Sequence, residues 1–286
     1  MQMVKYNSDF VINLFCIIDD ICKQIIPFKD KSNGGRPNNL TISELITISI
    51  LFLNSNCDAF SKFYFFANLQ DYFNLNSYPR LLHNLKSTLI WQLVILTLIC
   101  HKNRKLCDRI KLIDSMPIRV CKNKRIFTYK TSDLADRGKS SIGWFYGFKV
   151  HLVVDRNGRL LNFKITGGNI SDQNQVLLRQ LTKHLKGLLI GDAGYQSKEM
   201  FSEFKERGLY FLTGLKQSRK NLNMPVFQGY HLLKKLRQKL ETINGQIKFR
   251  QSMESSLPRS DNHYFWRYVS AILSFCILSQ FMGFGI

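Results

Sequence analysis

The sequence predicts an α/β protein, in which a mixed sheet flanked by helices follows a separate helical region. Up to about residue 105, apolar residues recur at helical spacing, as in the segment 10–26. From about residue 110, short apolar segments alternate with helical ones in the order strand, strand, strand, helix, strand, helix, strand, helix. We therefore expect two domains, residues 1–105 and 106–286.

The composition predicts an ordered protein with a polyanionic partner. The 286 residues carry a formal net charge of +21, from 41 basic and 20 acidic side chains, and 45% of them are hydrophobic. Such a charge favours nucleic acid or an anionic membrane surface as the partner. Seven cysteines without a CxxC pair, and six histidines without an HExxH pair, argue against a disulfide framework and a structural zinc site. A reducing cytoplasm is therefore the expected location.

The N-terminal region reads as helices joined by a basic loop. After the first helix, the segment 29–39 (KDKSNGGRPNN) is rich in turn residues. Thr41 or Ser43 is a suitable cap for a helix that extends to Leu53. Helices with a basic loop suit a DNA-binding module, although most such helices simply pack. At the other end of the chain, the apolar segment 268–286 predicts a buried helix rather than membrane contact.

The second region supplies the elements of the sheet. In chain order they are strands 111–120, 145–154 and 160–166, a helix 173–186, a strand 188–192, a helix 198–207, a strand 209–213 and a helix 231–249. Asp172, just before the first of these helices, is interpreted as its cap. The last helix has an apolar stripe formed by Leu232, Leu236, Leu240, Ile243 and Ile247.

Three carboxylates on separate elements are candidates for a metal site. Asp114 lies within the apolar strand LIDSMPI, and Asp192 closes the apolar run LLIGD. Glu241 is the only acid between Arg207 and Met253. A carboxylate in an apolar setting needs compensation, which a strand-end hydrogen bond, an ion pair or a divalent cation can provide. The hard ion Mg²⁺ prefers oxygen ligands, and two such ions can act together in phosphoryl transfer.

The last helix places two cations near Glu241. Arg237, Glu241 and Lys248 are spaced i, i+4 and i+11, which puts them on one helix face. One interpretation is an ordinary exposed ion pair worth about 0.5 kcal/mol or less. The other places Glu241 on a metal ion and both cations on DNA phosphates.

Several short motifs occur in the order in which one enzyme family has them, across about residues 112–281. They are Ile113-Asp114-Ser115, Arg125, FYGFKVH (145–151), ITGG (165–168), IGDAGY (190–195) and Arg237-x3-Glu241-x6-Lys248. The ordered set resembles the DDE transposases of bacterial insertion sequences and is most similar to insertion-sequence family 982. Residues 35–37 and 43–44 also look like the leader region of that family.

The resemblance implies a ribonuclease-H-like catalytic domain that cuts DNA at insertion-sequence ends and transfers the strand into target DNA. It implies two Mg²⁺ ions, or Mn²⁺ in their place, and double-stranded DNA as the partner. We also expect a homo-oligomer on DNA and no membrane association. The matching catalytic and metal-binding residues are Asp114, Asp192 and Glu241. The residues expected to contact DNA are Arg237, Lys248, Lys149, Arg125 and Tyr195.

Two positions depart from the family pattern. Related enzymes often have tyrosine three residues before the arginine, where this chain has Lys234. Gly245 lies inside the predicted catalytic helix, where glycine costs about 1 kcal/mol relative to alanine. Two other interpretations therefore stay open: a catalytically inactive DNA-binding relative, and a nuclease that cuts without joining.

Overall fold

The computed structural model describes residues 6–25, 38–128, 133–140, 143–195, 198–213, 227–250, 253–254, 258 and 260–283. The chain divides into two compact units. The helical unit comprises Met1–Leu98 and Gln246–Gly285, and the sheet unit comprises Ile99–Gly245. The expected division placed residues 106–286 in one domain, whereas the structure groups the C-terminal segment with the N-terminal helices. The predicted basic loop 29–39 lies largely outside the described residues.

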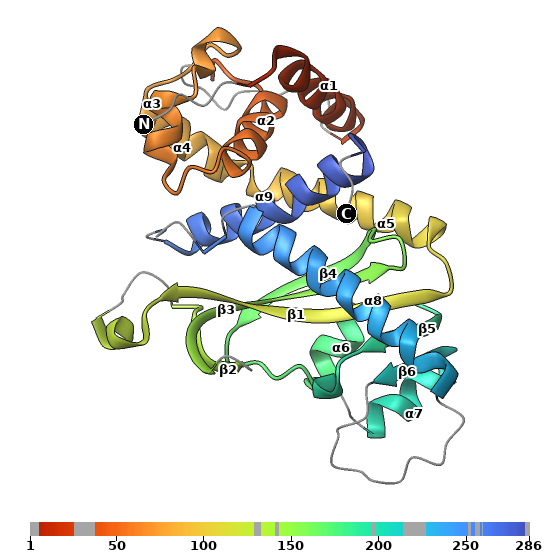
Figure 1. Ribbon diagram of the computed structural model, residues 1–286. Coiled ribbons are helices and arrows are strands. Elements are labelled where there is room, and N and C mark those ends of the chain that lie inside the picture. Colours follow the sequence, from red (N-terminus) through yellow and green to blue (C-terminus); the bar gives the residue numbers. More distant parts are fainter. Residues whose placement is uncertain are drawn as a thin grey trace. The chain divides into compact units, whose positions relative to one another are not determined.

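The helical unit is built from short helices that occur in both ends of the chain (Figure 1). They are α1 (Ser8–Ile25), α2 (Ile42–Leu53), α3 (Phe60–Phe66), η1 (Leu69–Asp71), α4 (Tyr78–Ser87), the first part of α5 (Leu89–Leu106), the π-helical turn η4 (Gln246–Arg250) and α9 (Asp261–Gln280). The Thr41 hydroxyl accepts a hydrogen bond from the Glu44 N–H, and the Glu44 carboxylate accepts one from the Thr41 N–H. This capping box confirms Thr41 as the N-cap residue of α2.

Helix α9 is buried, as the apolar C-terminal segment predicts. Trp266 stacks parallel to Phe52 of α2. Ser270 donates a hydrogen bond to Gln92, and Asn54 donates one to Ser274. The hydrophobic effect favours burial of such an apolar helix, and this is why the sequence predicted a buried helix for this segment. Among the described residues, one stretch, Tyr78–Leu106, is long and apolar enough to cross a membrane by length and composition alone, and 33% of its apolar window is buried.

The sheet unit contains a six-stranded mixed sheet (Figure 1). Its strands are β1 (Ile110–Cys121), β2 (Asp136–Ser140), β3 (Gly143–Asp155), β4 (Leu160–Gly167), β5 (Gly187–Gly191) and β6 (Leu209–Thr213). The strand order is β2-β3-β1-β5-β6, and β4 also pairs with β3. Strand β3 is antiparallel to β1. Strand β5 is parallel to β1, and β6 is parallel to β5. This arrangement confirms the ribonuclease-H-like mixed sheet. The sequence did not predict β2, whose residues DRGKS lack an apolar alternation.

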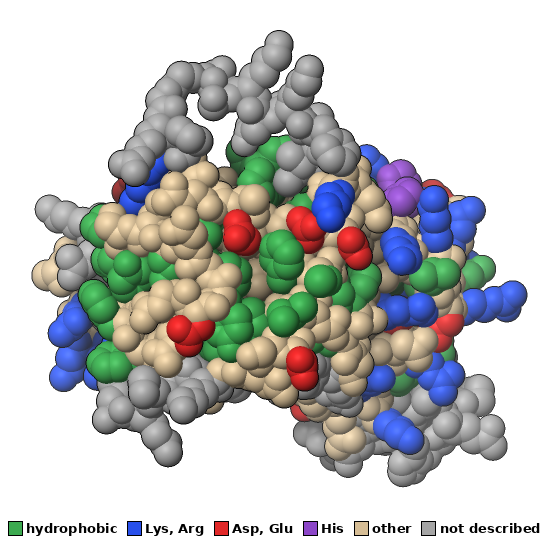
Figure 2. Space-filling model, turned by 90° about the horizontal axis from the view of Figure 1, so that it is seen from above, with side chains coloured by type: hydrophobic (Ala, Val, Ile, Leu, Met, Phe, Trp, Pro, Cys, Tyr) green, Lys and Arg blue, Asp and Glu red, His purple; other side chains and the backbone are tan. Residues whose placement is uncertain are grey.

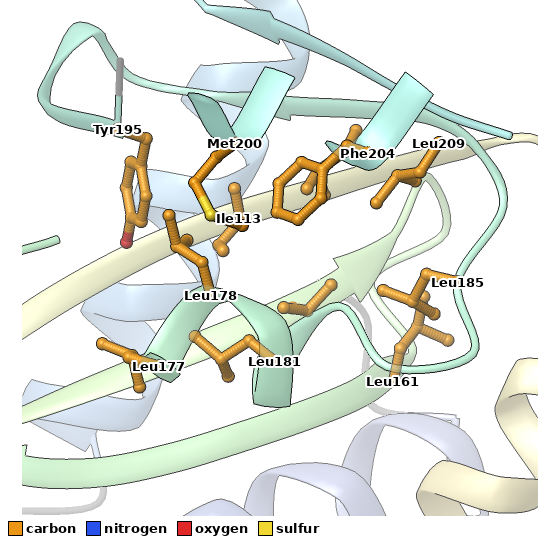
Figure 3. Packing of buried hydrophobic residues seen from close by; sticks show 12 residues of the cluster. Ile113, Leu161, Leu177, Leu178, Leu181, Leu185, Tyr195, Met200, Phe204 and Leu209 are labelled. Carbon is orange, nitrogen blue, oxygen red and sulfur yellow. The ribbon is translucent and has the colours of Figure 1, made fainter. Parts of the chain in front are cut away.

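Helices cover both faces of the sheet. On one face, α6 (Gln175–Leu181) and α7 (Lys198–Glu206) pack onto β1, β3 and β5 through a cluster of buried residues. Figure 3 shows members of this cluster, with Tyr195 at one end beside Met200 and Leu178. On the other face, α8 (Phe227–Gly245) crosses β1 and buries Leu236, Leu240 and Ile243. These three residues belong to the predicted stripe, because helical spacing brings them to one side.

At Gly147, the glycine of the FYGFKVH motif, strand β3 lies too close to β1 for a side chain to fit between them. Gly147 pairs with Arg119, next to a register shift in β1 between Arg119 and Cys121. A Cβ atom added to Gly147 would collide with the backbone carbonyl oxygen of Ile118. The motif therefore needs glycine here because no side chain fits between the strands.

Candidate active site

The sheet brings Asp114, which lies within β1, next to Asp192, which directly follows the carboxyl end of the neighbouring strand β5. Strands β1 and β5 are parallel, and Leu112 pairs with Ile190. Asp114 and Asp192 each follow two residues later, so they occupy equivalent places next to one another, on the same face of their strands. Both are half-buried. The carboxyl edge of parallel strands is a common place for a site in α/β proteins.

Glu241 reaches the same place from the helix that crosses this face. A small cavity of about 20 Å³ is lined by Asp114, Asp192 and Glu241 together with their neighbours Leu112, Ile113, Ile190, Gly191 and Leu240. Leu240 is buried, whereas Glu241 beside it is exposed, so the helix turns its apolar stripe to the sheet and Glu241 to the rim. The three predicted carboxylates therefore border one cavity.

Asn244 fixes the position of α8 against β1. Its side-chain Nδ2 donates a hydrogen bond of 2.8 Å to Oδ2 of Asp114. Asn244 is three residues after Glu241, so both side chains lie on the same side of the helix. The Asp114–Asn244 hydrogen bond thereby joins α8 to β1 beside the cavity that Glu241 borders. Sequence reasoning missed Asn244, although its i+3 spacing from Glu241 was a usable signal.

Asp192 is held by the turn that follows it. The Gly194 N–H donates a hydrogen bond of 2.6 Å to Asp192 Oδ1. A Cβ on Gly194 would lie 2.8 Å from the same oxygen atom. Glycine in the DAGY motif thus lets the carboxylate fold back over the backbone of η3 (Ala193–Tyr195).

The donor set suits a hard divalent cation. Three carboxylates from separate elements supply the oxygen ligands that Mg²⁺ and Mn²⁺ accept. The cavity has room for about one ion or one water molecule. As the side chains lie, no three His, Cys, Asp or Glu groups of the described residues are close enough to share an ion. Asp114 and Asp192 point at separate donors, so joint coordination requires their carboxylates to turn.

A second polar group lies on the opposite face of β1. Ser115 directly follows Asp114, so its side chain points to the opposite face of the strand. There it donates a hydrogen bond of 2.8 Å to Asp172. Lys149 of β3 lies 3.3 Å from the same Asp172 oxygen and donates a hydrogen bond to the Ile170 carbonyl. Asp172 was interpreted as a helix cap, and that interpretation is wrong, because Asn174 caps α6 by accepting from the Leu177 N–H.

Tyr195 and Lys149, both expected to contact DNA, point into this polar group instead. Tyr195 is completely buried, and Lys149 is 8% exposed. Burial raises the pKa of the Tyr195 phenol well above its usual range, and the charges of Asp172, Asp114 and Asp192 add to the effect. The phenol stays protonated, with its oxygen near Ser115 and the aspartates. This placement argues against direct DNA contact by either residue and indicates that both support the strands beneath the carboxylates.

The buried histidine of this group makes folding sensitive to acid. Burial, with a smaller contribution from the Lys149 ammonium, lowers the pKa of His151 to about 3. The pKa in the unfolded chain is about 6.5, so between these values the unfolded state binds more protons. Lowering the pH from 6.5 towards 3 should therefore reduce the free energy of unfolding by up to about 1.4 kcal/mol per pH unit.

Denaturant unfolding at pH 7 and pH 5 measures this effect, and His151→Gln is the matched variant. The glutamine has an amide that can replace the contact between His151 Nε2 and Thr166 Oγ1, which is 3.0 Å long. The variant should lose less stability than the wild type on acidification. Equal losses in the two proteins would contradict the assignment to His151.

The predicted DNA-contacting cations have different surroundings. Arg125 is exposed in η2 (Asn123–Thr128). Lys248 pairs with Glu254 at 3.1 Å, and it lies in the π-helical turn after α8 ends at Gly245. The regular spacing that placed Lys248 on the face of Glu241 therefore stops before Lys248. The side chains of Arg237 and Lys234 lie outside the described part of the chain.

Comparison with known proteins identifies the class. The family described as "Transposase DDE domain" matches residues 104–261, which is more than half of the chain. The chain belongs to this family of DDE transposase domains. The match covers all three carboxylates and the strands and helix that carry them. No match was found among curated protein sequences.

Solved structures of transposases show only distant likeness. A piggyBac transposase synaptic complex with hairpin DNA is similar over 96% of this chain and 73% of its own, with 12% identity and a TM-score of 0.43. The catalytic domain of Mos1 mariner transposase is similar over 72% of this chain and 95% of its own, with 13% identity and a TM-score of 0.25. These scores are too low to carry an argument, so the family match carries the assignment.

Proposed function

We propose that this chain is an insertion-sequence transposase that cuts DNA at the ends of its element and joins the freed end to target DNA. The observation that carries the proposal is the convergence of Asp114, Asp192 and Glu241 on one cavity, within a region that belongs to the DDE transposase family. The resemblance to insertion-sequence family 982 supports a bacterial element as the source.

The proposed reaction needs two displacements at phosphorus. In the first, a water oxygen bonds to the phosphorus while the bond to the 3′ oxygen breaks, leaving a 3′-hydroxyl and a 5′-phosphate. In the second, that 3′-hydroxyl bonds to a phosphorus of the target strand while a target 3′ oxygen leaves and takes the proton. Divalent cations held by the carboxylates, when bound, activate the attacking oxygen and stabilise the leaving one.

The residues of this chain position the reacting groups. Asp114, Asp192 and Glu241 would hold the cations, and Asn244 keeps Glu241 beside the two strands. Exposed Arg125 is available to phosphates, where a guanidinium gives charge-assisted hydrogen bonds. The net charge of +21 supports a DNA partner. Figure 2 shows many Lys and Arg side chains on the surface, and exposed cations attract a polyanion.

The test uses the full chain with labelled duplex DNA that carries the ends of its element. We expect cleavage with Mg²⁺ or Mn²⁺, none with EDTA, and joined products when target DNA is added. Binding without any metal-dependent nicking would show an inactive DNA-binding relative. Cleavage without joined products would show a nuclease.

A further inference from the structure

A second surface of the sheet unit combines exposed cations with exposed aromatic rings. It is formed by η2 and the β2–β3 hairpin, and we call it the hairpin surface. Its residues are Lys124, Arg125, Phe127, Arg137, Lys139 and Trp144, all exposed. In Figure 1 these elements form the end of the sheet furthest from β6. Of these six residues, only Arg125 was expected from the sequence to contact DNA.

Trp144 is held in place but only half covered. It pairs with Lys139 across the hairpin, and its carbonyl accepts a hydrogen bond of 3.0 Å from Asn123. The Arg137 guanidinium lies 4.8 Å and the Lys139 ammonium 5.7 Å from the ring centre. Such contacts orient an aromatic ring next to fixed positive charge. The ring nevertheless remains 50% exposed.

Phe127 strengthens the case for a ligand. It is 93% exposed, although burying a phenylalanine side chain is favourable by about 2–3 kcal/mol. A single exposed apolar residue is ordinary. Two exposed aromatic rings on neighbouring elements, with four cations around them, match the pattern of proteins that bind single strands, in which bases stack on rings and phosphates meet Lys and Arg.

The position of Trp144 relative to Asp114 fits the path of a DNA strand. Asp114 pairs with Leu152 of β3, and Trp144 lies eight residues earlier on the same strand. An even separation keeps both residues of β3 on one face, and the distance along the strand is about 25 Å. At 3.4 Å per nucleotide, that distance corresponds to about seven or eight nucleotides.

We propose that the hairpin surface binds a DNA strand with unpaired bases, about seven or eight nucleotides from the position that is cut. A base stacks on Trp144, and Arg137, Lys139 and the cations of η2 contact phosphates. The proposal rests on the proposed function, because it names the form of DNA that the same site uses. Unpaired bases are required because paired bases in a duplex do not offer their faces to a ring.

The test compares two labelled DNAs by fluorescence anisotropy in EDTA, with the full chain. One is a blunt duplex, and the other is the same duplex with an eight-nucleotide single-stranded extension. Wild-type protein should bind the extended DNA more tightly. Trp144→Ala should weaken binding of the extended DNA about tenfold and leave blunt duplex binding unchanged. Trp144→Phe should keep most of the preference, because phenylalanine still stacks.

Tyr210 provides the matched control, since it is 57% exposed on β6, away from the hairpin. Tyr210→Ala should bind both DNAs as the wild type does. Equal weakening on both DNAs by Trp144→Ala would show duplex contact only, and an unchanged preference would show no contact, so either result overturns the proposal. Thermal unfolding of each variant checks that it is folded. Failure of the proposed function is a separate result, namely absence of metal-dependent cleavage by wild-type protein.

Discussion

Replacing Asp114 with asparagine should reduce metal-dependent DNA cleavage by at least about 10³-fold, equivalent to about 4 kcal/mol of activation free energy. The change removes one negative charge from the donor set around the cavity and keeps the shape of the side chain. Asparagine also retains an oxygen that can accept from Asn244, so the packing of α8 on β1 should survive. DNA binding should therefore stay close to the wild-type level.

Asp192→Asn and Glu241→Gln should give losses of similar size, because each removes one of the three carboxylates that border the cavity. Cleavage rates under single-turnover conditions, with binding measured in parallel, provide the test. Glu203→Gln is the control, because this half-buried carboxylate pairs with Arg179 on the other face of the sheet. Wild-type cleavage by any of the three variants would remove that residue from the proposed site.

Replacing Gly147 with alanine should lower the free energy of unfolding by about 3 kcal/mol or more. The added methyl group meets the Ile118 carbonyl, which is backbone and cannot move aside without separating β3 from β1. Since β1 carries Asp114 towards the cavity, activity should fall in the folded fraction as well. Denaturant unfolding followed by circular dichroism measures the change.

Gly245→Ala is the matched control, and it is expected to raise the free energy of unfolding rather than lower it. Gly245 ends α8, and a Cβ there meets no atom within 4 Å. Alanine should therefore stabilise the helix by about 0.5–1 kcal/mol. If both glycine variants changed stability by the same amount and sign, the close approach at Gly147 would not be the cause of its effect.

The sequence predicted the strands well where periodicity was strong, whereas the helix expected over residues 173–186 covers only Gln175–Leu181 in the structure. Strand β6 has the predicted limits, and the limits of β1, β3, β4 and β5 differ from the predicted ones by only one or two residues. Periodicity could not reveal β2, because its pairing with β3 is a tertiary effect on polar residues. It could not reveal the π-helical turn after Gly245 either, since the apolar stripe continues through Ile247.

The residues of the candidate site also fall into two groups, those that the sequence could indicate and those that depend on tertiary structure. Asp114 and Asp192 could be singled out from the sequence, because one lies within an apolar strand and the other directly follows one, and the strand pattern is visible without side-chain detail. Asp172 could not be, because its partners Ser115 and Lys149 come from two strands whose register sequence does not specify. The sequence cannot distinguish an aspartate that caps the helix after it from one that, like Asp172, binds side chains of the sheet.

The C-terminal helix α9 belongs with the first helices of the chain, and this has a consequence for synthesis. A ribosome releases α2 early, but α9 emerges only after the whole sheet unit, and its Trp266 and Ser270 complete the packing around Phe52 and Gln92. The sheet unit can fold in the interval, whereas the helical unit must wait with an unfilled apolar surface.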